Sequence, residues 1–383
     1  MTGTTTAKLA DRLAVYAAEL RLAGAIRTDA VHDAFATVPR HHCLQRFRYR
    51  ADEYTVEPDT TPAEEVLDLV YANNSLVTHT GRDGDPPSSS SSPSLMAKML
   101  EALDVQPRHR VLEIGAGTGY NAALIAHITG AEVTTVESGA EAAAGAAASI
   151  RALDLADQVH VIQGDGYAGY PEHGRYDRII VTCGVAGIPP HWLDQLADDG
   201  LILAPIAHAG VHPIFATRLD GAALVARVAL WADFMPAAGP LRPPTLFHHH
   251  PADDLPADRL HPVDGTGISL TADEYHNLWF YLGTEDERIA RAYLADPDFD
   301  PTRGPCALVD PVHGGAWIHR DGGITLAGAD HLRDELMTLI DRWERLHRPA
   351  ATAWTVDFRH TDTGTAGLLL THRWHLKPPS PQP

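Results

Sequence analysis

Cysteine is scarce in this sequence, and its three cysteines lie far apart. Cys43, Cys183 and Cys306 are too few and too widely spaced for a disulfide framework or a paired-cysteine metal site. No apolar run approaches the roughly 18 residues that a membrane-spanning helix needs. The N-terminal residues also lack the basic and then apolar order of a signal peptide. We therefore expect a cytoplasmic protein with no membrane partner.

Positive charge is scarce as well, because 30 Lys and Arg stand against 50 Asp and Glu in 383 residues. The resulting net charge of −20 argues against a general nucleic-acid binder, although a local basic patch stays open, and it opposes docking on an anionic membrane. Hydrophobic residues make up 44% of the chain and charged residues only 21%, so the composition predicts a folded core. At about 150 residues a domain, the length suggests two domains, or one domain with a large appendage.

Residues 88–235 alternate between strand and helix patterns. The predicted elements, in chain order, are 111–114, 121–129, 133–136, 140–153, 159–162, 179–182, 190–196 and 201–205. This alternation is typical of a doubly wound parallel α/β sheet. Two further strands, 214–219 and 223–231, flank Asp220-Gly221 and predict a hairpin that closes the sheet.

Three other regions surround this core. Residues 1–87 predict an N-terminal helical region, with two short helices within 7–37 and an acidic, turn-rich stretch at 51–87. Residues 236–265 are rich in proline and histidine and are interpreted as a linker. Residues 266–383 predict a C-terminal accessory domain. Its expected helices are 271–282, 284–295 and 329–347, and its expected strands are 353–359 and 366–374.

Five consecutive serines at 88–92 precede Pro93. On composition alone such a run predicts a flexible linker. A helix pattern over 94–103 follows directly, however, and Ser92 or Ser94 can cap it. The run therefore leads straight into a structured element, and both interpretations stay open.

A glycine-rich turn, EIGAGTG at 113–119, lies between a predicted strand and a predicted helix. Glycines let the backbone turn tightly and let a ligand approach closely. Glu137 ends the next strand, where an acid accepts hydrogen bonds from ribose hydroxyls. Asp165, in Gly164-Asp165-Gly166 after the third strand, can accept from an adenine amino group.

Two ligands fit this turn: a dinucleotide or S-adenosyl-L-methionine. The third glycine of a dinucleotide fingerprint is replaced here by Tyr120. Glu113 would repel a pyrophosphate but suits the cationic methionine end of S-adenosylmethionine. In the alternative interpretation, the turn binds no ligand and only packs the helix against the strand. We therefore expect S-adenosyl-L-methionine as the cofactor.

Several segments together resemble the protein-L-isoaspartate (D-aspartate) O-methyltransferases over roughly residues 8–235. They are VPR at 38–40, SSPSLMAKM at 91–99, VLEIGAGTGY at 111–120, GDG at 164–166, YDRIIVT at 176–182, and IP at 188–189 with QL at 195–196. The resemblance implies a class I S-adenosylmethionine-dependent methyltransferase with a Rossmann-like sheet, N-terminal helices and an α+β C-terminal extension.

The resemblance also implies residue roles. Ser91 would be the catalytic hydroxyl beside the methyl-accepting carboxylate, with Ser90, Ser92, Arg40 and His41 on the substrate side. A surface or capping role for His41 stays open. Cofactor binding is implied for Glu113, Gly115, Gly117, Gly119, Tyr120, Asn121, Glu137, Asp165 and Gly166.

The implied chemistry asks little of the protein. The acceptor carboxylate is already ionised at pH 7, so no general base is required. Catalysis would come from alignment of the reacting atoms and from exclusion of water. A nucleophilic role for Ser91 is disfavoured, because the sequence has no GxSxG elbow there and pairs it with no base. Attack by the following backbone nitrogen would turn the methyl ester into a succinimide, which hydrolyses to aspartate or isoaspartate.

Two departures from the family bear on the substrate. SSSSP at 89–93 stands where the family has T-I-S-Q-P, and about 150 residues follow the sheet. The long tail is similar to that of actinobacterial relatives that methylate an aspartate in a ribosomally made peptide such as a lanthipeptide, lasso peptide or graspetide. We therefore expect a modified precursor peptide as partner. General protein repair at isoaspartate and a non-catalytic binding protein are the alternatives.

Other candidate groups have a structural interpretation beside the functional one. The histidines at 248–250 could bind a metal, but a solvated loop is favoured and no metal site is expected. Cys183 is interpreted as a small buried apolar residue. The aromatic residues that could line a peptide groove or pack in a core are Trp279, Tyr281, Trp317, Trp343 and Trp354.

Overall fold

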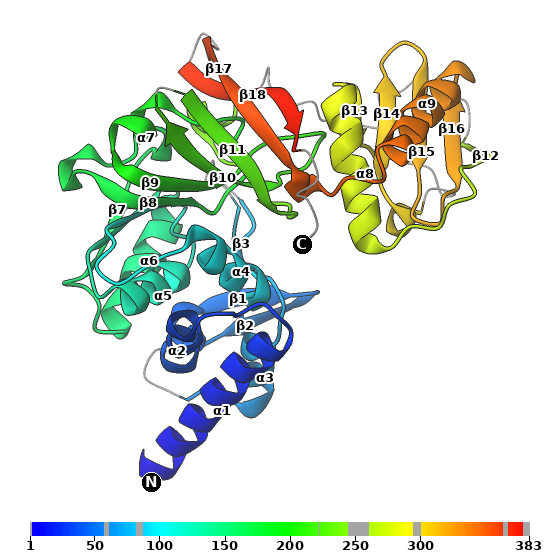
Figure 1. Cartoon of the computed structure of the whole chain (residues 1–383). Coiled ribbons are helices and arrows are strands. Elements are labelled where there is room, and N and C mark those ends of the chain that lie inside the picture. The colour runs from blue at the N-terminus through cyan, green and yellow to red at the C-terminus, as the bar shows by residue number, and fades with distance from the viewer. Residues whose placement is uncertain are drawn as a thin grey trace, which may run out of the picture.

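The computed structural model describes residues 2–56, 61–81, 87–221, 223–243, 260–293, 300–362 and 367–377. Within these ranges the strands form three sheets, and Figure 1 shows how the sheets and helices are arranged. None of the helices in the described ranges is long and apolar enough to cross a membrane.

The N-terminal region combines helices with a small antiparallel sheet. Its elements are α1 (Thr2–Leu22), α2 (Asp29–Thr37), η1 (Arg40–Cys43), β1 (Arg46–Tyr49), β2 (Asp52–Thr55), α3 (Glu64–Tyr71), β3 (Leu76–His79) and β4 (Ser88–Ser90). The sheet order is β2-β1-β3-β4. The stretch at 51–87, expected to be mainly turns, therefore contains β2, α3 and β3.

The serine run is ordered structure. Its first three residues form β4, which pairs with β3 through Leu76↔Ser90 and Val77↔Ser89. Helix α4 (Pro93–Leu103) starts directly after Ser92, with proline in its first turn, where the missing backbone N–H costs nothing. The flexible-linker interpretation is wrong, because strand pairing and the buried face of α4 hold both ends of the run.

The central sheet has the predicted doubly wound core. Its strands are β5 (Val111–Ile114), β6 (Val133–Glu137), β7 (Val159–Gln163), β8 (Tyr176–Val181), β9 (Leu196–Pro205), β10 (Ile214–Asp220) and β11 (Ala223–Leu230). The helices that follow its parallel strands are α5 (Tyr120–Thr129), α6 (Ala140–Ala152) and α7 (Pro190–Asp194). Strands β5 to β9 pair in parallel in the order β7-β6-β5-β8-β9, and β10 and β11 continue antiparallel. The strand order reverses at β5, where such sheets bind ligands beyond the carboxyl ends of their strands.

The two faces of this sheet are buried in different hydrophobic clusters. Val111 packs with residues of α1, α2, α4 and α5, whereas its neighbour Leu112 belongs to a second cluster. Every residue of β5 and β6 is buried, as expected for parallel strands covered on both sides. Two of these buried residues, Glu113 and Glu137, are carboxylic acids, which need hydrogen-bond partners.

The C-terminal region contains its own antiparallel sheet, in the order β12-β16-β15-β14-β13. Its elements are β12 (His261–Val263), α8 (Ala272–Glu285), β13 (Ile289–Arg291), β14 (Cys306–Asp310), β15 (Gly314–Ile318), β16 (Ile324–Gly328) and α9 (His331–Arg345). The helix expected at 284–295 is wrong, because α8 ends at Glu285 and strand β13 follows. The aromatic residues considered for a peptide groove are all buried, so they pack in the core: Trp279, Tyr281, Trp317, Trp343 and Trp354.

The last hairpin returns to the central sheet. Strands β17 (Trp354–Asp362) and β18 (Gly367–Leu376) pair with each other, and β17 pairs with β11 through Ala226↔Val356. Figure 1 shows this red hairpin beside β11, with the yellow and orange C-terminal sheet next to it. The prediction that 266–383 forms one separate unit therefore fails for the hairpin. An open strand edge such as that of β11 is a template for pairing with another strand. The local sequence pattern of β11 does not predict which distant strand will pair with it.

Candidate functional site

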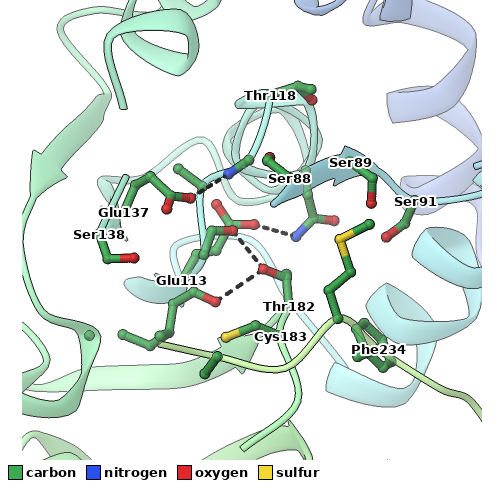
Figure 2. Close-up of a pocket in the computed structure, with 18 of the residues that line it drawn as sticks. Ser88, Ser89, Ser91, Glu113, Thr118, Glu137, Ser138, Thr182, Cys183 and Phe234 are labelled. Atoms are coloured by element: carbon green, nitrogen blue, oxygen red, sulfur yellow. Dashed lines mark hydrogen bonds between the residues drawn. The ribbon is translucent and has the colours of Figure 1, made fainter. Parts of the chain in front are cut away.

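A cavity of about 300 Å³ lies at the carboxyl ends of β5, β6 and β8 (Figure 2). The serine run, the glycine turn, the loop after β8 and the segment 233–238 enclose it. Its lining includes Ser75, Ser88, Ser89, Ser90, Ser91, Glu113, Gly115, Gly117, Thr118, Asn121, Glu137, Ser138, Asp165, Gly166, Thr182, Cys183, Asp233, Phe234 and Met235. The cavity thus occupies the place where the strand order reverses.

The glycine turn closes against the end of β8. Gly115 and Gly117 have φ of +97° and +53°, in the left-handed region that favours glycine. A Cβ atom on Gly115 would lie 2.4 Å from Thr182 Oγ1. That hydroxyl donates to the carbonyl oxygen of Gly115 at 2.6 Å, so it locks the turn. Thr182 was not singled out from the sequence, although it ends the matched YDRIIVT segment.

Glu113 forms the floor of the cavity and is fully buried. Its Oε1 accepts from Asn121 Nδ2 at 2.7 Å, and its Oε2 accepts from Thr135 Oγ1 at 2.6 Å. Burial raises the pKa of Glu113 to about 7, and the nearby Glu137 carboxylate acts in the same direction. A cation bound above Glu113 would favour its ionised form.

Glu137 and Asp165 stand at the two positions that the sequence predicts. Glu137 Oε2 accepts from the backbone N of Gly117 at 3.0 Å, and its Oε1 accepts from the N of Gly139 at 3.1 Å. Asp165 Oδ1 accepts from the backbone N of Tyr167 at 2.9 Å. Both carboxylates line the cavity, as does Gly166.

Gly119 and Tyr120, for which the resemblance implies cofactor binding, are not among the lining residues. Gly119 is the N-cap of α5 and packs against α6, where a Cβ would lie 3.1 Å from the oxygen of Ala146. The Tyr120 ring meets Phe35 edge-on, with 6.2 Å between the ring centroids. The side chain of Tyr120 packs in the core beside the N-terminal helices, and only 1% of the residue is exposed to solvent.

The serines divide between the cavity and the scaffold. Ser91 lines the cavity, as predicted, and so do Ser88 and Ser89, which were not predicted. Ser90 also lines it but is 3% exposed, and its hydroxyl accepts from Arg40 at 3.2 Å. Ser92 is the N-cap position of α4 and is not part of the lining, and its contact with substrate stays a prediction.

Arg40 and His41 are buried behind the serine strand and do not reach the cavity. The Arg40 guanidinium donates to the carbonyl oxygens of Val70 at 2.7 Å and Ser91 at 2.9 Å. His41 Nδ1 lies 2.8 Å from the Tyr71 hydroxyl, and burial lowers the pKa of His41 to about 4. Neither side chain is among the lining residues, so their contact with substrate stays a prediction. Arg40 therefore holds the segment that carries Ser90 and Ser91, because a buried guanidinium must satisfy its donors on nearby acceptors. His41 contacts Tyr71 of α3 instead.

The segment 233–238 forms a wall that sequence reasoning missed. It follows β11 and pairs with the loop after β8, since Gly184 N donates to Met235 O and Ala237 N to Gly184 O, both at 2.8 Å. No local motif marks this segment, which straddles the expected start of the linker. Cys183 in the same loop is half-buried, and desolvation raises the pKa of its thiol to about 12, so it stays a neutral thiol.

The charge of the lining distinguishes the two ligands considered from the sequence. The described lining residues include four acids, namely Glu113, Glu137, Asp165 and Asp233, and no Lys, Arg or His. Such a cavity opposes a pyrophosphate and suits a cationic sulfonium. Across the described ranges no group of three or more His, Cys, Asp or Glu could hold a metal ion, and the histidines at 248–250 lie outside them.

Comparison with known proteins identifies the family. A family model described as protein-L-isoaspartate(D-aspartate) O-methyltransferase matches residues 14–240, more than half of the chain. The chain belongs to this methyltransferase family. A protein-L-isoaspartate O-methyltransferase of Methanoregula boonei is 36% identical over 204 residues, which span 53% of this chain and 82% of that protein. One of Thermococcus sibiricus is 34% identical over 183 residues, 48% of this chain and 72% of that protein.

A solved structure extends the family match to the C-terminal region. The structure of a protein-L-isoaspartate O-methyltransferase superposes with a TM-score of 0.52 at 25% identity. The match covers 92% of this chain and 98% of that one. A long C-terminal region therefore does not by itself separate this chain from the isoaspartate methyltransferases.

Family membership confirms three predictions. The fold is that of a class I methyltransferase, the protein is a carboxyl O-methyltransferase, and the methyl donor is S-adenosyl-L-methionine. The acidic lining without cationic side chains fits that donor. The assignment of individual residues to the donor and to the acceptor stays a prediction.

Proposed function

We propose that this protein transfers the methyl group of S-adenosyl-L-methionine to the side-chain carboxylate of an L-isoaspartyl residue in a peptide or protein. The observation that carries the proposal is the cavity itself. It joins an acidic donor side, with Glu113 and Glu137, to an acceptor side that carries Ser91. Family membership supports the isoaspartyl acceptor.

The residues of this chain act by binding and alignment. The sulfonium of S-adenosylmethionine supplies an activated methyl group. Glu113 and Glu137 hold the donor side, while the Ser91 hydroxyl orients the acceptor carboxylate without neutralising it. The acceptor is ionised at neutral pH, so no base is needed. A bond forms between a carboxylate oxygen and the methyl carbon as the sulfur–carbon bond breaks, and the donor leaves as the neutral thioether.

The later steps need no further group from the protein. The backbone nitrogen after the methylated residue attacks the ester carbonyl, methanol leaves, and a succinimide forms. Hydrolysis of either succinimide carbonyl gives aspartate or isoaspartate. Repeated rounds convert isoaspartate to aspartate, which is the basis for proposing protein repair.

Maturation of a ribosomally made, modified peptide is the second candidate. Its remaining support is the serine-rich acceptor side, where Ser88, Ser89, Ser90 and Ser91 all line the cavity. The C-terminal region no longer favours it over repair, because a solved isoaspartate methyltransferase matches 92% of this chain.

Two synthetic peptides of one sequence, differing only in isoaspartate or aspartate, separate these candidates. The protein is incubated with methyl-labelled S-adenosylmethionine, and labelled methanol is collected while mass spectrometry follows the ester and succinimide. Methylation of the isoaspartyl peptide alone supports repair. Methylation of the aspartyl peptide alone contradicts the isoaspartyl acceptor and favours peptide maturation. If neither peptide is methylated at millimolar concentration, the proposed function is overturned.

A further inference from the structure

The acceptor side of the cavity is held by the C-terminal region. Strand β13 ends at Arg291, whose guanidinium pairs with Asp233 Oδ2 in the cavity wall. Asp233 Oδ1 lies 3.2 Å from His212 Nδ1. A Cβ on Gly210 would lie 2.3 Å from the backbone N of Arg291, so the loop that carries His212 packs directly on β13.

A second contact fixes the same wall from helix α8. Trp231, just before the wall, stacks on His276 with ring centroids 4.9 Å apart and an interplanar angle of 14°. Trp279 packs beside Trp231 and donates from Nε1 to the oxygen of Ala209 at 3.0 Å. Two elements of the C-terminal region therefore set the position of residues 231–235.

This wall belongs to the acceptor side. Figure 2 shows Phe234 on the same side of the cavity as Ser91, and Glu137 and Ser138 on the opposite side. Asp233 is adjacent in sequence to Phe234 and also lines the cavity. An acceptor carboxylate that enters the cavity therefore shares it with Asp233.

We propose that Arg291 is a positioning residue that neutralises Asp233 and so admits a carboxylate acceptor to the cavity. The idea rests on the proposed function, because it requires an acceptor of negative charge. Without the Arg291 guanidinium, the Asp233 carboxylate would repel the incoming carboxylate, since like charges several ångström apart repel strongly in a partly desolvated site. The Asp233 side chain is 36% exposed and that of Arg291 23%, so solvent screens this repulsion only in part.

Arg291→Ala is the first test variant. We expect the KM for an isoaspartyl peptide to rise about tenfold, the size of one unit charge acting across several ångström at a protein surface. The Kd of S-adenosylmethionine should not weaken, because the donor is a cation. Added salt should reduce the KM difference from the unaltered protein.

The double variant Arg291→Ala/Asp233→Asn decides between repulsion and loss of structure. Removing the carboxylate removes the repulsion, so its KM should return to within about threefold of the unaltered protein. Arg291→Lys keeps the charge and should also behave nearly as the unaltered protein. The matched control is Arg303→Ala, which breaks another Arg–Asp pair of the C-terminal region, that with Asp321 at 2.9 Å, and should leave the KM unchanged.

Three results would overturn the inference. The first is an unchanged peptide KM in Arg291→Ala. The second is a double variant as impaired as Arg291→Ala, which would mean that Arg291 contacts the acceptor itself or only supports the fold. The third is a defect in donor affinity in place of acceptor KM. Failure of the unaltered protein to methylate either peptide would instead overturn the proposed function, so the two failures are distinguishable.

Discussion

The buried carboxyl of Glu113 makes the stability of the donor-free protein depend on pH in a direction opposite to that of an ordinary ion-paired acid. Burial raises its pKa from an ordinary 4.5 to about 7. Because the pKa is higher in the folded state, the folded protein holds a proton that the unfolded chain has lost. The contribution to stability is therefore full below about pH 4.5 and is lost as pH rises through about 7.

The size of the effect follows from the shift. One pKa unit corresponds to about 1.4 kcal/mol, so raising the pH from 5.5 to 8 removes about 2 kcal/mol through Glu113. At an unfolding entropy of about 2 cal/mol/K per residue, a 383-residue chain loses about 2–3 °C in Tm.

Glu113→Gln keeps the shape of the side chain and removes its ionisation. We expect the Tm of the unaltered protein to fall about 2–3 °C further between pH 5.5 and 8 than that of the variant, measured by calorimetry without S-adenosylmethionine. A saturating concentration of the donor should reduce the difference, because its cation favours ionised Glu113. Glu132→Gln, at a side chain 58% exposed, is the matched surface control.

Parallel Tm–pH curves for the unaltered protein and Glu113→Gln would refute this reasoning. They would mean that the carboxylate is already ionised at pH 5.5, so that Asn121 and Thr135 outweigh the cost of burial. A difference of the opposite sign, with the variant losing more stability at high pH, would refute it equally.

Three other substitutions test the site. Ser91→Ala should lower kcat for methyl transfer at least tenfold with nearly unchanged donor affinity by calorimetry, whereas Ser92→Ala, outside the cavity lining, should change neither. Gly115→Ala should lower the unfolding free energy by about 1–3 kcal/mol and weaken donor binding, because the added Cβ would lie 2.4 Å from Thr182 Oγ1. A Tm within one degree of that of the unaltered protein would contradict this geometry. Arg40→Leu should lower the unfolding free energy by about 3 kcal/mol, because it leaves buried carbonyls unpaired, and the midpoint of urea unfolding should fall. An unchanged midpoint with a raised peptide KM would indicate instead that Arg40 binds substrate.

The donor half of the site could be predicted from the sequence because it is local. The turn that carries Gly115 and Gly117 needs a positive φ at both, and only a glycine pattern between a strand and a helix supplies it. Glu137 and Asp165 then follow from the rule that parallel strands end at one edge of a sheet.

The acceptor half was predicted only in part. The family resemblance, with its register set by Pro93, implied Ser91, which lines the cavity. Arg40 and His41 are polar residues whose burial depends on α3 and β4 packing over them. Tyr120 begins a helix whose first side chain could face either the ligand or the core. The Tyr120 side chain faces the core, where it contacts Phe35, 85 residues earlier in the chain.

By itself the sequence determined the methyltransferase sheet, the glycine turn and the acids at the ends of its strands, because each depends on neighbours within a few tens of residues. Only the tertiary structure decided where the last hairpin pairs and what forms the acceptor wall. Val356 meets Ala226 across an open strand edge, and Arg291 meets Asp233 across a domain contact. Such pairings form only when folding brings two distant surfaces together. Neither the periodicity nor the motifs of either segment predict that distance.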